Sequence, residues 1–271
     1  MIEVLAWAMR CALLVGALLS AGHVMIAVLH GCGAPRIAPA ILALIGASGG
    51  FMVQASALTG TPSGAFDPVM LGLLWSTVQG TALAFYVAGA LILILGAGVG
   101  RVWVQAAGAA ILLSGFLVAG HVADLPGWTV SLVLAVHLGL AAYWVGVLWP
   151  LYRLAGQNAQ SAGALGHKFG QVALAAIPAL IALGIIMAVI LLDRFDQLWT
   201  TDYGVALVTK VSAVVIMLGL GAANKLRHVP AVRAGAQGAG RQLRASLAFE
   251  AAAVSGVLAA TAAFSTVAGL P

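Results

Sequence analysis

Long apolar stretches, separated by short polar segments, follow one another along the whole chain. A helix needs about 20 mostly apolar residues to cross about 30 Å of hydrocarbon. The pattern therefore predicts eight membrane-spanning helices, at residues 4–30, 36–58, 80–99, 102–122, 129–152, 168–192, 205–224 and 244–268. The segment 66–79, between the second and third spans, is shorter and amphipathic, so we expect it at the membrane surface. The predicted fold class is all-α, a polytopic transmembrane helical bundle.

The amino-acid composition supports the same conclusion. Of the 271 residues, 63% are hydrophobic and 7% are charged, against roughly 25% charged residues in an ordinary soluble domain. A water-soluble fold of this length has too little interior for so many apolar side chains. The lipid bilayer is therefore the predicted solvent and the first predicted partner of the chain.

Nine of the twelve basic residues follow the first, third, fifth and seventh predicted spans. These residues are Arg36, Arg101, Arg153, Lys168, Lys225, Arg227, Arg233, Arg241 and Arg244. Because Lys and Arg accumulate in cytoplasmic loops, both termini are predicted to lie outside the cytoplasm. The formal net charge of +5 then reflects membrane topology, and no nucleic-acid partner is expected.

A short sequence repeat divides the chain into two halves. Residues 75–83 and 199–207 share Trp, Ser or Thr, Thr, two variable residues, Gly, one variable residue, Ala and Leu. Each copy precedes the third span of a set of four. We therefore predict two parallel four-helix repeats, residues 1–124 and 125–271, related by a pseudo-twofold axis along the membrane normal. The alternative is that Trp and Thr recur because both are favoured at membrane interfaces.

Two histidines near the predicted outer side are candidate metal ligands, because ionisable groups inside a bilayer are costly and often mark a site. His137 lies about nine residues into the fifth span, which is about 14 Å along a helix. Trp144 follows on the same helical face, and His121 ends the fourth span. His121 and His137 are predicted to converge in one coordination sphere or short relay. The alternative is a structural hydrogen bond between helices.

A stripe in the first span offers further soft or imidazole donors. Met9, Gly16, His23 and His30 are seven residues apart, so they share one helical face. Met9 and His23 are the candidate metal ligands of this stripe. A face used only for helix packing, with His30 at the cytoplasmic interface, is the favoured explanation of the spacing.

The last two spans contain the remaining candidate binding or pathway residues. Lys210, Met217 and Asn224 are seven residues apart in the seventh span, and Glu250 lies about two turns into the eighth. A carboxyl at that depth is expected to be protonated, paired with a basic residue such as Arg244, or open to an aqueous cavity. A structural hydrogen bond across helices is the competing explanation.

Motifs of soluble catalysis are absent from the sequence. It contains no phosphate-binding glycine loop, nucleophile elbow, CxxC pair or HExxH motif. The chain is therefore not expected to be an enzyme, and an ATP-driven pump is excluded.

Several segments after Gly115 resemble the copper resistance protein D (CopD) family of bacterial inner-membrane proteins. They are SGFLVAGHVADL, VHLGLAAYWVGVLWPL, HKFGQVALAAIPALIALGIIMA, TTDYGVALVTK, ANKLRHVP and LRASLAFE. The family-like positions are His121, His137, Trp144, Gly146, Thr201, Tyr203, Gly204, Lys210, Asn224 and Glu250. The chain departs from the family pattern at Val147, where a second glycine is usual, and at His167, where Arg is frequent.

The resemblance implies multi-pass copper handling in the bacterial cytoplasmic (inner) membrane, usually described as uptake beside periplasmic copper carriers. His121 and His137 would receive the ion, as Cu(I) or Cu(II), because imidazole binds both, and Met donors would select Cu(I). A membrane redox protein that binds haem b through His23 and His137 is the first alternative. A non-catalytic partner in copper-protein assembly is the second.

Overall fold

A computed structural model describes residues 1–32, 37–119, 128–191 and 202–264 of the chain. This part is all helical, and it contains no strand. The helices are α1 (Ile2–His30), α2 (Ile37–Thr59), α3 (Pro68–Trp75), α4 (Val78–Gly98), α5 (Val102–Val118), α6 (Trp128–Gln157), α7 (Ala159–Leu191), α9 (Asp202–Ala223), α10 (Val229–Arg233) and α11 (Ala239–Phe264). A 3₁₀ turn, η1 (Pro62–Phe66), precedes α3, and a π-helical segment, η2 (Asn224–His228), continues α9.

Each of the eight predicted spans overlaps one long helix. Among the described residues, six helices are long and apolar enough to cross a membrane: α1, α2, α4, α6, α7 and α11. The helix α5 has 17 residues, fewer than the expected span 102–122. The all-α membrane-type bundle is thus confirmed for the described part, whereas eight crossings remain a prediction.

The segment expected at the membrane surface forms only the eight-residue helix α3. Asp67 caps this helix, because its carboxylate Oδ1 accepts a hydrogen bond of 2.8 Å from the backbone N–H of Val69. A helix of eight residues is about 12 Å long and cannot cross a bilayer. It is not amphipathic as expected, because Val69, Leu73 and Trp75 are all apolar and exposed.

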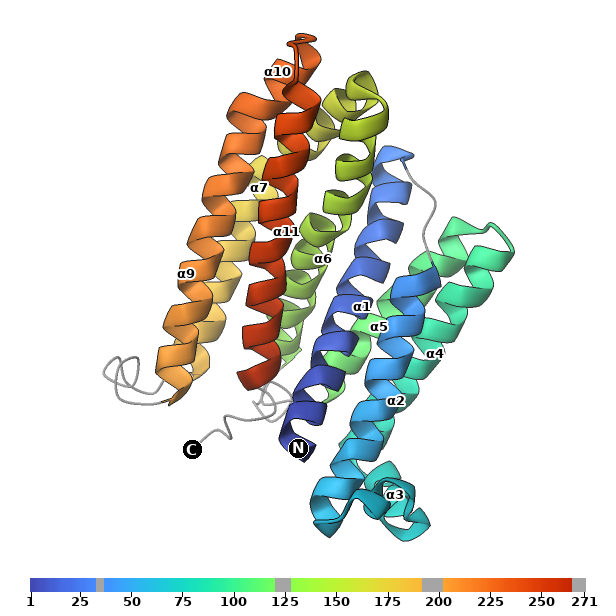
Figure 1. Cartoon of the computed structure of the whole chain (residues 1–271). Coiled ribbons are helices and arrows are strands. Elements are labelled where there is room, and N and C mark those ends of the chain that lie inside the picture. The colour runs from blue at the N-terminus through green and yellow to red at the C-terminus, as the bar shows by residue number, and fades with distance from the viewer. Residues whose placement is uncertain (33–36, 120–127, 192–201, 265–271) are drawn as a thin grey trace.

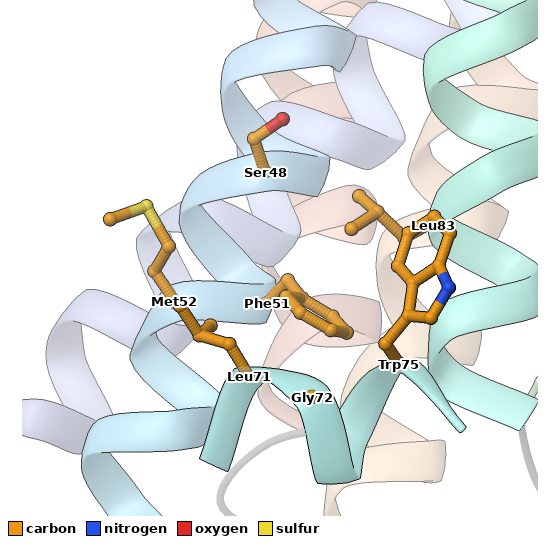
Figure 2. Close-up of a pocket in the computed structure, with 7 residues that line it drawn as sticks. All are labelled: Ser48, Phe51, Met52, Leu71, Gly72, Trp75 and Leu83. Carbon is orange, nitrogen blue, oxygen red and sulfur yellow. The ribbon is translucent and has the colours of Figure 1, made fainter. Parts of the chain in front are cut away.

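An apolar groove of about 450 Å³ lies where α3 packs against α2 and α4. Figure 2 shows the side chains that line it, including Phe51, Trp75 and Leu83. Its lining is apolar, and none of the predicted ligands belongs to it. The groove faces the surroundings of the bundle and does not contribute to the site described below.

The long helices form two groups that meet along α1 and α6 (Figure 1). In the first group, α1 and α4 each pack on α2 and α5. In the second group, α6 packs on α7 and α11, and α9 packs on α11. Between the groups, α1 contacts α6 and α11, and α6 contacts α1 and α5.

The contact between α1 and α6 depends on two glycines. A Cβ atom on Gly22 would lie 2.6 Å from the Cα atom of Gly146, and a Cβ on Gly146 would lie 2.6 Å from the carbonyl oxygen of Gly22. These distances are too short for any side chain. Small residues at such crossings let two backbones approach closely, as is common in membrane bundles.

The end of α6, the start of α7, η2 and the start of α11 lie at the end of the bundle that holds α10 (Figure 1), and each of them carries basic residues. Arg233 and the His167 imidazole lie 3.1 Å apart, and Arg244 donates a hydrogen bond of 3.0 Å to the Tyr152 hydroxyl. Lys225 donates to the carbonyl oxygen of Gly170. The first residues of α1 and the last of α11 lie at the opposite end. The basic residues named here therefore share one end of the bundle, whereas the side of the membrane on which they lie stays a prediction.

Candidate functional site

The carboxylate of Glu250 lies inside the second helix group and is 3% exposed. Its Oε1 accepts a hydrogen bond of 2.6 Å from the indole Nε1 of Trp144, in α6. Its Oε2 accepts a hydrogen bond of 2.6 Å from the side-chain Nδ2 of Asn224, in η2. Three segments that are distant in sequence thus meet at one buried acid.

Trp144 is held against Glu250 by close packing. The indole is 4% exposed and belongs to an apolar cluster with Met217 and Leu247. Gly221, in α9, faces both groups: a Cβ there would lie 3.3 Å from Cζ2 of Trp144 and 3.7 Å from Oε1 of Glu250. Gly221 therefore leaves just enough room for the indole and the carboxylate to meet.

Asn224 is the first residue of the π-helical segment η2. Its side chain is 6% exposed, and its Oδ1 is buried without a hydrogen-bond partner among the described residues. Single π-helical turns inside α-helices occur frequently at functional sites. An orphan acceptor beside a buried carboxylate is costly, and it is a feature that packing alone does not explain.

Four predicted pathway residues thus lie in one cluster: Trp144, Met217, Asn224 and Glu250. Glu250 does not pair with Arg244, one of the arrangements considered for it. Arg244 stacks over the Tyr152 ring, 4.5 Å from its centroid, and donates to the Tyr152 hydroxyl. Glu250 instead accepts hydrogen bonds from Trp144 and Asn224, the structural arrangement that was also considered.

His137 faces α7. Its imidazole Cε1 would lie 3.6 Å from a Cβ placed on Gly184, so that glycine makes room for the ring. His121, the predicted second ligand, lies outside the described residues. Their convergence therefore stays a prediction.

His23 and His137 stand at different heights along the bundle. Gly22 contacts Gly146, and α1 and α6 run in the same direction (Figure 1). His137 precedes Gly146 by nine residues, about 14 Å along the helix, whereas His23 follows Gly22 directly. This offset disfavours a single haem iron held between these two imidazoles, because axial ligands lie at one level.

The stripe on α1 contacts two different helices. The side chain of Met9 lies against Gly49 and Gly50 of α2. His30, at the other end, has its Nε2 2.8 Å from the Tyr143 hydroxyl of α6. Within the residues that the structure describes, no group of three or more His, Cys, Asp and Glu side chains is placed to hold a metal ion.

Two further predicted residues, Tyr203 and Lys210, have side chains outside the described part of the chain. The sequence also gave no reason to single out Tyr143 or Gly221. Tyr143 binds a partner 113 residues away, a distance that no local spacing reveals. Gly221 is one of 34 glycines, and only the folded contact distinguishes it.

Comparison with known families identifies this region. Residues 163–264 match the family model of copper resistance protein D. Over these residues, the chain is similar to the CopD family. This CopD region, residues 163–264, includes all of α9, η2, α10 and α11 and nearly all of α7, so it supplies Asn224 and Glu250, whereas Trp144 precedes it. Searches of curated proteins and of solved structures found no match.

The match confirms the family resemblance over the C-terminal region. The chain is accordingly a multi-pass, membrane-type helical protein with a copper-resistance family region. The CopD region supplies two of the three side chains that meet at the buried acid, Asn224 and Glu250 itself.

Proposed function

We propose that the protein carries copper across the bacterial inner membrane as part of copper resistance or homeostasis, and that it does so without catalysing a reaction. The observation that supports the proposal most is the CopD match, because it covers the helices that supply Asn224 and Glu250 to the buried cluster. Polar groups kept inside a bilayer at this cost usually serve a substrate or ion pathway.

In this proposal, copper arrives from a periplasmic carrier protein and first meets His121 and His137 near the outer side. Imidazole binds copper in either oxidation state, and Met9 and His23 supply the softer or inner donors. The room that Gly184 leaves for His137 supports this role, since it keeps the imidazole between α6 and α7.

The proposed topology has eight crossings, both termini outside and two parallel four-helix halves, residues 1–124 and 125–271. Two observations support the halves. Gly22 and Gly146, which touch, are 124 residues apart, as are Trp75 and Trp199. A pseudo-twofold axis between α1 and α6 would interchange α1 with α6 and α5 with α11. The contact of α1 with α11 and that of α6 with α5 are then equivalent, and both are present. Trp199 itself lies outside the described residues.

The test is copper uptake by the full chain reconstituted in liposomes. We expect copper to accumulate inside proteoliposomes over time, above protein-free liposomes of the same lipid. The matched control is the double variant His121→Ala, His137→Ala, which should insert and purify but accumulate less copper. Uptake equal to that of protein-free liposomes would contradict transport.

The purified protein should be analysed for metals and by optical spectroscopy in the same experiment. Copper without a Soret band agrees with the proposal. A stoichiometric haem and its Soret band would favour the redox alternative. Copurification of a stoichiometric second protein, with no uptake, would favour a non-catalytic role in assembly.

A further inference from the structure

The charge of the Glu250 site is unbalanced among the described residues. The Trp144 indole and the Asn224 amide nitrogen can only donate, so both carboxylate oxygens act as acceptors. Charge-assisted hydrogen bonds are shorter than neutral ones, and both of these N···O distances are short, at 2.6 Å. No described cation forms an ion pair with this carboxylate. A negative charge within the bundle thus has two dipoles beside it but no counter-charge from any described side chain.

The orphan Oδ1 of Asn224 adds a second, independent observation. It is a buried acceptor without a donor, attached to the amide that already binds Glu250. A half turn of this amide would exchange Nδ2 and Oδ1 and bring an acceptor to Oε2. That arrangement is favourable only if Oε2 carries a hydrogen.

The little room around the Glu250 carboxylate favours a proton over a metal cation as its ligand. Gly221 leaves only van der Waals distances to Trp144 and Glu250. The small cavity of about 10 Å³ between α6 and α7 touches Trp144, but neither Glu250 nor Asn224 lines it, so it adds no room at the carboxylate. A sodium ion needs several oxygen ligands, and of the three described side chains that meet here, Glu250 and Asn224 alone have oxygens. A proton needs one.

We propose that Glu250 is a proton-binding site inside the bilayer and that Asn224 is its switch. In the ionised state, Nδ2 of Asn224 donates to Oε2. When hydronium transfers a proton to Oε2, one hydronium O–H bond breaks, a carboxyl O–H bond forms and water is released. The amide then rotates, so that the hydrogen bond from Nδ2 is replaced by one in which Oδ1 accepts from the new O–H. The negative charge is neutralised and the orphan acceptor gains a donor, with no electron transferred.

Several titratable groups of the elements packed on α11 have partners elsewhere. On α1 and α6, His30 binds Tyr143; on α10, Arg233 contacts His167. On α11 and η2, Arg244 binds Tyr152 and Lys225 binds the Gly170 carbonyl. The remaining titratable groups on these elements are Glu3, Arg10, Cys11, His23, His137, Arg153, Arg227, His228 and Arg241, and α9 adds Asp202, Tyr203 and Lys210, whose side chains lie outside the described part. The carboxyl's hydrogen bonds involve none of them.

The sequence offers a selective probe, because Glu3 and Glu250 are its only glutamates. Glu3 is exposed at the start of α1, so Glu3→Gln should fold normally. The full-length Glu3→Gln protein, in lipid nanodiscs and with its glutamate carboxyl carbon labelled with carbon-13, then gives a single carboxyl signal by NMR. The Asn224 side-chain amide is followed in the same sample with nitrogen-15.

We expect the Glu250 carboxyl signal to titrate in one step between about pH 4 and about pH 9, with the Asn224 amide shifting at the same midpoint. Replacing sodium chloride with choline chloride should change neither signal. Introduced into the wild-type sequence, Glu250→Gln should abolish the pH-dependent shift of the Asn224 amide signal. Asn224→Leu should leave the titration of the Glu250 carboxyl signal in place.

A Glu250 signal that stays constant across this range would overturn the proposal. So would a shift caused by sodium at constant pH, which would make the site a metal-cation site. The proposal deepens the proposed transport function by naming an ion that could be coupled to it. Because the experiment contains no copper, its failure and the failure of copper uptake are distinguishable.

Discussion

The indole Nε1 of Trp144 and the carboxylate Oε1 of Glu250 are 2.6 Å apart although 106 residues separate them in the chain. This hydrogen bond ties α6, which precedes the CopD region, to the last helix of that region. A bilayer gives the Glu250 carboxylate no water as a substitute partner. The bond therefore contributes both to stability and to the ionic state of the site.

Trp144→Phe should lower the free energy of unfolding by about 1.5–3 kcal/mol, because a buried charged acceptor loses a donor while most of the ring packing is kept. Unfolding in mixed detergent micelles, followed by circular dichroism, measures the change. Trp103→Phe is the matched control, because Trp103 is 73% exposed and should change stability little. Equal effects of the two substitutions would refute the assigned role of the hydrogen bond.

Gly146→Val should disrupt the contact between α1 and α6, since even one Cβ would overlap the backbone of Gly22. Overpacking of this kind costs about 1–3 kcal/mol or more. Gly139→Val tests the same helix and the same substitution at a position with no atom within 4 Å. We expect low yield and aggregation on size exclusion only for the Gly146 variant; normal behaviour of both variants would show that the contact is dispensable.

His137→Ala should reduce copper-dependent growth and copper uptake more than His228→Ala. His228 lies in η2, where burial and then the positive charge of Arg227 lower its pKa below the usual range. Both substitutions remove an imidazole, but only that of His137 lies on the proposed path. If uptake survives loss of both His121 and His137, the search should move to Met9, His23 and His30.

Cysteine labelling tests the orientation across the membrane. In a variant without Cys11 and Cys32, cysteines at positions 127 and 196 should react with a membrane-impermeant reagent added outside intact cells. A cysteine at position 235 should react only after the cells are opened, because it lies among the basic residues at the α10 end. Reaction at position 235 in intact cells would reverse the topology.

The sequence predicted the helices well because each span is a continuous apolar run, a signal contained in neighbouring residues. The boundaries were less accurate: α7 begins at Ala159, nine residues before the predicted start at 168. Gly and polar residues at positions 160–167 do not resemble a span, yet the helix continues because packing against α10 stabilises it. Helices therefore extend beyond the apolar segment that reveals them.

The candidate site was predicted only as a set of separate residues. Glu250 was conspicuous because a carboxyl in an apolar run is rare, and Asn224 because it shares a face with Met217. Nothing in the sequence indicated that Glu250 would select Trp144 and Asn224 over Arg244. That choice depends on how α6, α9 and α11 rotate against one another, which is a property of the packed bundle.

The contact between Gly22 and Gly146 bears on how the two proposed halves arose in evolution. If the two halves are repeats, these glycines are equivalent positions, and their contact is that of one residue with its own copy at the axis of a homodimer. The proposed two-half architecture predicts an ancestral four-helix protein that dimerised through this glycine before its gene was duplicated and fused. The carboxylate at position 250 lies in the second half. In this proposal the chain is a covalently linked dimer of two halves. The contact between the two glycines keeps the symmetry, and the buried carboxylate site lies in the second half.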